Sequence, residues 1–336
     1  MTEPTVAPTA ESAVARSGRR LPGGVTRNLG LVIALVLICL VGFITAGGRF
    51  ASVDNMMTIL RLAAIVGVVS IGQTFVITAG GIDLSVGSML GLATVWATTG
   101  ANQYYANQTT WLLMVAVALV VGVAGGLLNG IMVAYGKIAP FMATLAMMVA
   151  AKGLAEWIAN RQTQIVKVRG FETFFSANPL GIPMLVWIFA VVAAAGWVVY
   201  NRTTFGRRTV AIGGNLEASR LAGIKTNRHL VLLYALCGLT VGIAAVMMMG
   251  RTMAGTSTHG TLYEMDSIAA VVVGGTLLTG GRGTIFGTVI GVLIFTTLTN
   301  IFTQNNLPTS VQEITKGIII VGAVLLQLRI AQRAKA

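Results

Sequence analysis

The residues with the clearest chemical potential in this sequence surround one double-glycine turn. Asp83 comes directly after Gly80, Gly81 and one isoleucine, and lies two residues before Ser85 in an otherwise apolar stretch. An ionised carboxylate in apolar surroundings is costly unless it is hydrated, paired or hydrogen-bonded. We therefore expect Asp83 either to cap a helix that begins at Leu84 and Ser85, or to take a direct part in moving a polar solute.

Other polar side chains interrupt apolar segments farther along the chain. Polar groups that face lipid are disfavoured, so such residues either line a pathway or bond to a neighbouring helix. Lys152 has Glu156 one helical turn away as its expected ion-pair partner. The candidate pathway residues are Gln73, Asp83, Ser85, Asn129 and Thr144.

A polar loop at residues 201–228 carries the signals of a short helix. Asn215 can cap its N-terminus, Glu217 suits the positive end of the helix dipole, and Gly223 can end it in the left-handed conformation. Ala218 and Ser219 give it small side chains between these points. The loop therefore predicts a two-turn helix that either enters a groove on another protein as a rigid lever or rests on a membrane surface.

The sequence contains no pattern for a metal site or for nucleotide binding. His229 and His259 are far apart and have no acidic or cysteine partners at ligand spacing, while Cys39 and Cys237 lie inside apolar blocks as packing thiols. No phosphate-binding loop occurs, because Gly136-Lys137 lacks the earlier glycine and the following hydroxyl residue. We expect no enzymatic activity and no cofactor bound by this chain.

The elements that must position these residues are membrane-spanning helices. Hydrophobic residues make up 55% of the 336 residues, charged residues only 10%, and the mean hydropathy is +0.82. The net charge of +13 does not indicate nucleic-acid binding, because the basic residues lie between apolar blocks and not on one soluble face. The sequence predicts an all-α, polytopic bundle with ten spans at about residues 29–46, 57–80, 83–100, 111–135, 139–159, 182–200, 229–250, 266–279, 283–302 and 311–328.

Two of these spans are the weakest, because Gly-rich turns border them at residues 79–83 and 280–283. Each can be a full crossing or part of a helix that breaks inside the membrane. The runs around the two turns also resemble each other weakly, as duplicated halves of a transporter would. Small residues four apart predict helix packing faces at Gly87 and Gly91, at Gly122, Gly126 and Gly130, and at Gly287 and Gly291.

The distribution of lysine and arginine predicts the orientation. Fifteen of the 23 lie on the side of the N-terminus, five on the opposite side and three within spans, so both termini and the 201–228 loop are expected in the cytoplasm. Residues 1–28 are expected to be a disordered cytoplasmic tail, 29–328 the transmembrane domain, and 329–336 a short cytoplasmic tail. The first apolar segment is interpreted as an uncleaved span and not as a signal peptide, because it is longer than a usual signal core.

The run from Gly72 to Gly87, with its Gly-Gly-Ile-Asp-Leu-Ser-Val-Gly end, resembles the signature of the ribose-type, or simple-sugar, permeases of ABC importers. Further similar runs follow at residues 137–145, 206–223 and 266–284, and the resemblance covers about residues 55–328. The chain departs from the family pattern at Ala146, where glycine is frequent, and at Leu277, where serine is usual.

This resemblance implies a permease subunit in the bacterial cytoplasmic (inner) membrane that imports a pentose, a hexose or a related polyol. The short helix would correspond to the loop that seats such permeases on their ATPase, with Asn215, Glu217, Ala218, Ser219 and Gly223 as coupling residues. The implied partners are ABC ATPase subunits, which would use ATP and Mg²⁺, a second copy of the permease in a homodimer, and an extracytoplasmic sugar-binding protein received by the loop at 160–180.

Two other functions fit parts of the pattern. A branched-chain amino-acid permease belongs to a neighbouring family, and only the Gly-Gly-Ile-Asp-Leu-Ser run argues against it. An autonomous secondary transporter or channel needs paired charges or an ion site within the membrane, and few such charges are present.

Overall fold

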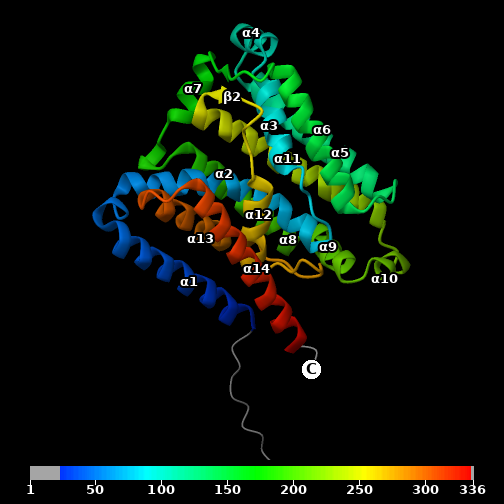
Figure 1. The fold of residues 1–336 in the computed structure, drawn as a ribbon. Coiled ribbons are helices and arrows are strands. Elements are labelled where there is room, and N and C mark those ends of the chain that lie inside the picture. The colour runs from blue at the N-terminus through cyan, green and yellow to red at the C-terminus, as the bar shows by residue number, and fades with distance from the viewer. Residues whose placement is uncertain (1–22, 334–336) are drawn as a thin grey trace, which may run out of the picture.

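The computed structural model describes residues 23–333, and almost all of their regular structure is helical (Figure 1). The only strands among these residues are β1 (Gln164–Ile165) and β2 (Ala254–Gly255), which pair antiparallel. The α-helices are α1 (Gly23–Ala46), α2 (Val53–Thr78), α3 (Val86–Ala97), α4 (Gly100–Gln108), α5 (Leu112–Ala134), α6 (Pro140–Ala159), α7 (Arg169–Ser176), α8 (Met184–Arg202), α9 (Thr204–Gly214), α10 (Leu216–Leu221), α11 (Thr226–Thr252), α12 (Tyr263–Val273), α13 (Ile285–Gln304) and α14 (Thr309–Arg333). Short 3-10 helices lie between α1 and α2 at Gly47–Arg49 and between α7 and α8 at Pro179–Gly181.

Seven helices of the described chain are long and apolar enough to cross a membrane, namely α1, α2, α5, α6, α8, α11 and α13. The third and eighth predicted spans are wrong as full crossings. α3 has 12 residues and α12 has 11, which gives each a length of only about 16–18 Å against the roughly 30 Å of hydrocarbon. Both helices instead border irregular glycine-containing segments, as the broken-helix interpretation predicts. The chain is therefore an all-α, polytopic membrane bundle.

The N-terminal boundary also differs from the prediction. α1 begins at Gly23, so residues 23–28 are helical and do not belong to a disordered tail, and residues 1–22 lie outside the described residues. The start of α1 and the end of α14 lie at the same end of the molecule as α9 and α10 (Figure 1). This arrangement agrees with the lysine and arginine count. The cytoplasmic location of that end stays a prediction.

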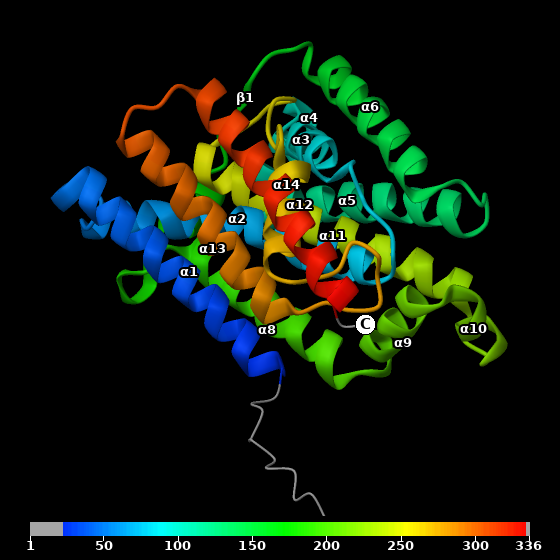
Figure 2. The same ribbon diagram turned by 60° about the horizontal axis from the view of Figure 1, so that its bottom comes forward.

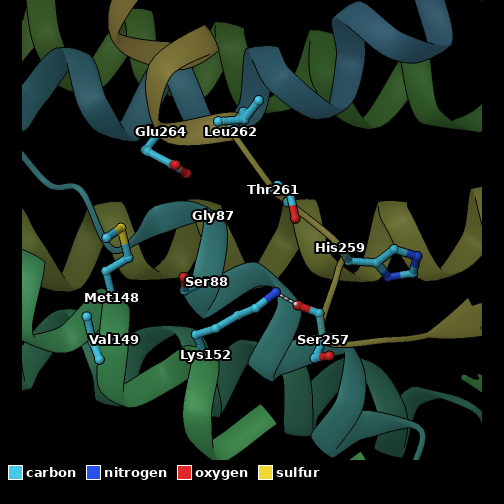
Figure 3. A pocket seen from close by; sticks show the side chains of 11 residues that line it. Gly87, Ser88, Met148, Val149, Lys152, Ser257, His259, Thr261, Leu262 and Glu264 are labelled. Atoms are coloured by element: carbon cyan, nitrogen blue, oxygen red, sulfur yellow. Dashed lines mark hydrogen bonds between the residues drawn. The ribbon is translucent and has the colours of Figure 1, made fainter. Parts of the chain in front are cut away.

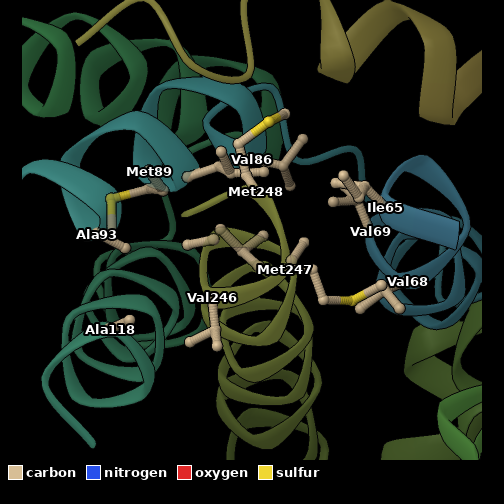
Figure 4. Packing of buried hydrophobic residues seen from close by; sticks show 14 of the residues in the cluster. Ile65, Val68, Val69, Val86, Met89, Ala93, Ala118, Val246, Met247 and Met248 are labelled. Carbon is tan, nitrogen blue, oxygen red and sulfur yellow. The ribbon is translucent and has the colours of Figure 1, made fainter. Parts of the chain in front are cut away.

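The centre of the bundle is built by α2, α3, α5 and α11. In α2, 83% of the most apolar window is buried, compared with 11% in α1, so α2 is central and α1 faces outward. Figure 4 shows the core around α11, with Val68 and Val69 of α2 on one side of Met247 and Met89 of α3 on the other. Every residue of α2 from Ala63 to Thr78 is buried, because neighbouring helices surround this largely apolar stretch on all sides.

The predicted glycine packing faces of α5 and α13 are confirmed as helix contacts, whereas Gly87 and Gly91 of α3 both face the loop before α12. Gly122 and Gly126 of α5 lie against the backbone of Gly238 in α11, so closely that side chains at these positions would collide. Gly291 similarly packs on Ala270. Gly91 contacts a loop and not a helix, because a Cβ there would lie 2.9 Å from the carbonyl oxygen of His259.

The charges within the bundle pair differently from the helical-spacing prediction. Glu156 forms its ion pair with Arg161 at 3.2 Å, and Lys152 instead donates a hydrogen bond to the carbonyl oxygen of Ser257 at 2.7 Å. Lys316 of α14 pairs with Asp266 of α12 at 2.9 Å, which ties together two helices that lie side by side in Figure 2. The expected Lys152–Glu156 pair is therefore wrong, because the distant Ser257 carbonyl oxygen accepts from the lysine, and Arg161, just after the end of α6, pairs with the glutamate.

Candidate coupling helix and buried pathway residues

The predicted short helix in the polar loop is present as α10, and both of its ends are capped. The Asn215 side chain accepts a hydrogen bond from the Ala218 amide at 2.9 Å at the N-terminus. At the C-terminus, Gly223 has φ +83°, its amide donates to the carbonyl oxygen of Arg220, and the Ile224 amide donates to that of Ser219. These two hydrogen bonds together form a Schellman motif, which requires a residue in the left-handed conformation at the position of Gly223. The predicted short helix is thus confirmed, with both ends capped by its own residues.

The surface of α10 is charged and exposed. Glu217 forms an ion pair with Arg220 at 2.5 Å, and this hydrogen-bonded guanidinium lowers the pKa of the Glu217 carboxyl, which therefore stays ionised at neutral pH. Leu216 and Leu221 are 49% and 78% exposed. Two exposed leucines on a six-residue helix beside an ionised pair form a surface suited to docking on another protein. Ala218 is exposed beside them and Ser219 faces inward, so the five predicted coupling residues lie on one small unit.

A second helix, α9, attaches this unit to the bundle and was not predicted from the sequence. Thr203 caps its N-terminus by accepting from the Gly206 amide. Thr209 of α9 is hydrogen-bonded to Nε2 of His229 at 2.9 Å, and the Phe205 ring stacks against the His229 ring at a centroid distance of 4.4 Å. His229 therefore fixes α9 to the start of α11. No group of three metal-ligating side chains occurs among the described residues.

Three double-glycine pairs converge where α9 meets the membrane domain. They are Gly80-Gly81 after α2, Gly213-Gly214 at the end of α9, and Gly280-Gly281 after α12. The Gly281 amide donates to the carbonyl oxygen of Thr78 at 2.8 Å, and a Cβ on Gly280 would lie 2.8 Å from the Gly213 oxygen and 2.9 Å from the Gly80 nitrogen. The two turns that resemble each other in sequence thus lie back to back. The end of α9, the helix that leads to α10, packs against both turns.

The five candidate pathway residues all gather around the break between α2 and α3. Gln73 donates to the carbonyl oxygen of Asp83 at 2.5 Å. One Asp83 carboxylate oxygen accepts from the Ser85 amide at 2.9 Å and from its hydroxyl at 2.6 Å. Asn129 of α5 donates to the Ser85 hydroxyl at 2.9 Å, and Thr144 of α6 reaches the carbonyl oxygen of Ile82 at 3.3 Å. The network therefore joins α2, α5 and α6 to one irregular segment.

This network holds the break in place, and its members do not line an open path in this conformation. Gln73, Asp83, Ser85, Asn129 and Thr144 are each at most 2% exposed. The prediction that Asp83 caps a helix starting at Leu84 is wrong, because α3 begins at Val86 and its N-cap residue is Ser85. Asp83 instead closes a local turn through Ser85, as short acidic side chains do where the backbone is irregular. A direct role of the five residues in transport stays a prediction.

Two features next to this network distinguish it from an ordinary packed core. Gln73 Oε1, Asn129 Oδ1 and the Tyr234 hydroxyl are buried without a hydrogen-bond partner among the described residues. A cavity of about 390 Å³ lies beside Gly80 and Gly81 and extends to Leu216 at the start of α10. Buried polar atoms are normally paired, so the helices around the segment between α2 and α3 keep unused hydrogen-bonding capacity, with space beside them.

The comparisons with known proteins agree with this architecture. The family model described as "Branched-chain amino acid transport system / permease component" matches residues 55–324. The chain is 39% identical to the ribose import permease protein of Bacillus subtilis (strain 168), over 90% of this chain and 93% of that one. It is 37% identical to the ribose import permease protein of Escherichia coli (strain K12), over 92% and 97%. No solved structure matches.

A third relative shows how the family name and the names of its members differ. The galactose/methyl galactoside import permease protein of Escherichia coli (strain K12) is 33% identical, over 88% of this chain and 92% of that one. The relatives named here are thus sugar permeases, although the model that matches is named after amino-acid transport. This chain belongs to that family of transport permeases, resembles its sugar-importing members, and is a multi-pass protein of the bacterial inner membrane.

Proposed function

We propose that this chain is the permease subunit of a binding-protein-dependent ABC importer that moves a monosaccharide, either a pentose or a hexose, into the cytoplasm. Two copies form the path, an ATPase subunit docks on each α10 helix, and ATP hydrolysis on that subunit drives transport. The single observation that supports this most is the arrangement of α10 and α9. The capped α10 is exposed, and α9, which leads to it, packs against both broken-helix turns. An autonomous transporter has no need for such an external lever.

Energy in this scheme comes from another chain, because the sequence contains no phosphate-binding loop. The chain itself is then not an enzyme. ATPase closure moves α10, and the stiff α9 transmits the displacement to the Gly80-Gly81 and Gly280-Gly281 turns. The contacts between α9 and the two turns are closely packed, so they cannot deform gradually. A displacement of α9 therefore shifts both turns together.

The outer end of the molecule offers a surface for the sugar-binding protein. It contains α7 and the loop before it, where Lys167, Arg169 and Glu172 are exposed. The sugar assignment rests on the relatives, whose names are those of ribose and galactose permeases. Import of a branched-chain amino acid is the competing function, and the family model's description is the observation that favours it.

Uptake by cells that lack their own sugar importers tests this proposal. The chain is produced with the ATPase and binding-protein subunits of the same transporter, and uptake of labelled D-ribose, D-xylose, D-galactose and L-leucine is measured. We expect uptake of at least one sugar, none of L-leucine, and no uptake when any subunit is omitted. Uptake of L-leucine alone contradicts the sugar assignment, and ATP hydrolysis by the purified chain without its ATPase contradicts the subunit assignment.

A further inference from the structure

A cavity whose largely apolar wall is interrupted by polar and charged side chains lies at the first turn of α3. Its volume is about 300 Å³, at the lower end of the range for small-molecule sites. Three elements meet there, namely the first turn of α3, the middle of α6, and the loop at 256–262 that leads into α12 (Figure 3). Side chains that line it include Ser88, Met148, Val149, Lys152, Thr261 and Glu264.

The ammonium group of Lys152 has spare hydrogen-bonding capacity in this cavity. An ammonium group can donate three hydrogen bonds, and that of Lys152 donates one, to the carbonyl oxygen of Ser257. Its nearest acidic neighbour on α6 is not available, because Glu156 forms its ion pair with Arg161. The lysine therefore lines the cavity with donors to spare, and it forms no ion pair with a described carboxylate.

The carboxylate of Glu264 is the matching group on the other side. It lies in the first turn of α12 and forms no ion pair with any residue that the structure describes. Lys316 of α14 is not available to Glu264, because it forms an ion pair with Asp266 of α12. Figure 3 shows the Lys152 and Glu264 side chains reaching toward the α3 turn from different elements without meeting. A cation and an anion that face one cavity without forming an ion pair with each other leave space for a third, polar molecule between them.

The backbone around the cavity is held rigidly. Gly87 of α3 packs directly on the backbone of Gly260, which has φ +76°, so neither position has room for a side chain. The His259 ring is turned toward Thr94, to which its Nδ1 is hydrogen-bonded at 3.3 Å. The loop that supplies Ser257 and Thr261 is thus fixed against α3. The cavity is therefore preformed, which lowers the cost of binding.

From this geometry we infer that the permease has a monosaccharide-binding site of its own in the cavity between Lys152 and Glu264. The inference rests on the proposed function for the class of solute. Two neighbouring sugar hydroxyls donate to the Glu264 carboxylate, while Lys152 donates to a hydroxyl or ring oxygen, with Thr261 as a further partner. Met148 and Val149 contact the apolar C–H face of the sugar.

The second cavity beside α6 serves as an internal contrast. Its volume is about 750 Å³, and its walls are almost wholly apolar, with Met89, Leu92, Trp96, Val117 and Leu154 among them. A sugar placed there would lose the hydrogen bonds of its hydroxyls to water without replacement, at a cost of roughly 1–3 kcal/mol for each group. Of these two cavities, the Lys152–Glu264 cavity is the one that offers both a charged donor and a charged acceptor. Its place beside a broken helix matches the usual location of transporter substrate sites.

Protection of a cysteine from modification tests this site directly. Ser88→Cys is introduced into a Cys39→Ala, Cys237→Ala chain, which is purified with its ATPase subunit in lipid nanodiscs and treated with a small hydrophilic methanethiosulfonate. At a sugar concentration of about ten times Kd, occupied sites outnumber free ones tenfold, so D-ribose, D-xylose or D-galactose should slow the reaction about tenfold. Ser176→Cys on the outer surface is the control, and its modification rate should not change.

Substitutions in the cavity make the test specific. Glu264→Gln and Lys152→Met should each abolish protection of Ser88→Cys, while Glu156→Gln, on the same helix but outside the cavity, should keep it. Co-purification of the ATPase subunit with each variant shows that the chain is folded. Absence of protection by any sugar that the complete importer takes up overturns the site and leaves the proposed function intact. Protection by L-leucine and by no sugar overturns the sugar assignment, and an importer that takes up no sugar contradicts the proposed function itself.

Discussion

The backbone amide of Gly281 donates a hydrogen bond to the carbonyl oxygen of Thr78 at 2.8 Å, which joins the turn after α12 to the end of α2. Gly213 of α9 lies against the same bond. A Cβ on Gly213 would collide with the Thr78 oxygen and lie 2.5 Å from the Gly281 nitrogen. The link between the coupling helix and both breaks therefore depends on bare backbone at residue 213. Any movement of α9 must displace the two breaks together.

Gly213→Ala should therefore separate coupling from docking. The added methyl forces α9 away from the Thr78–Gly281 bond, an overpacking that costs about 1–3 kcal/mol and should reduce sugar uptake about tenfold or more. α10 itself is untouched, so the ATPase subunit should still co-purify. Gly214→Ala is the matched control, because a Cβ on Gly214 meets no atom within 4 Å. Equal uptake by the two variants would remove the glycine contact from the coupling route.

Gly223→Val should abolish docking, because the Schellman motif needs φ +83° at this residue and a β-branched side chain disfavours it strongly. We expect normal membrane levels, loss of ATPase co-purification and loss of uptake. Gly181→Val is the control, since Gly181 has φ +75°, equally open surroundings and a place at the opposite end of the molecule. If Gly223→Val retained its ATPase subunit, α10 would be better interpreted as a helix that rests on the membrane.

Glu217→Lys should weaken ATPase association by a different route. The substitution places a cation at the positive end of the α10 dipole, breaks the Arg220 ion pair and reverses the charge of the docking surface. Glu172→Lys provides the same reversal in the first turn of α7, at the other end of the molecule, and should leave ATPase co-purification unchanged. Because the pKa of Glu217 is lowered, the wild-type interaction should persist throughout the neutral and mildly acidic range and weaken only as the pH falls through this lowered pKa.

Labelling of single cysteines tests the orientation. In a chain without Cys39 and Cys237, an impermeant maleimide should modify Ser176→Cys in intact cells and Ala222→Cys only after the membrane is made permeable. Both positions are exposed, so access alone does not separate them. The reverse pattern would place α10 outside the cell and would exclude contact with a cytoplasmic ATPase.

The sequence by itself determined the properties that depend on composition and on local spacing. Long apolar blocks predicted a polytopic helical bundle, and Asn215 and Gly223 predicted a short capped helix, because a cap involves only residues a few positions apart. The double-glycine turns marked where helices break. These signals are local, so no knowledge of the neighbouring helices was needed to read them.

Only the tertiary structure decided which distant groups meet. Lys152 of α6 bonds the carbonyl oxygen of Ser257, 105 residues away, and does not pair with Glu156 one turn along the same helix. Lys152 and Glu264 are separated by more than one hundred residues, and no spacing rule connects them. Their place on one cavity follows from the packing of α3, α6 and α12, where close backbone contacts at Gly87 and Gly260 fix the helices and leave two opposite charges facing the same space.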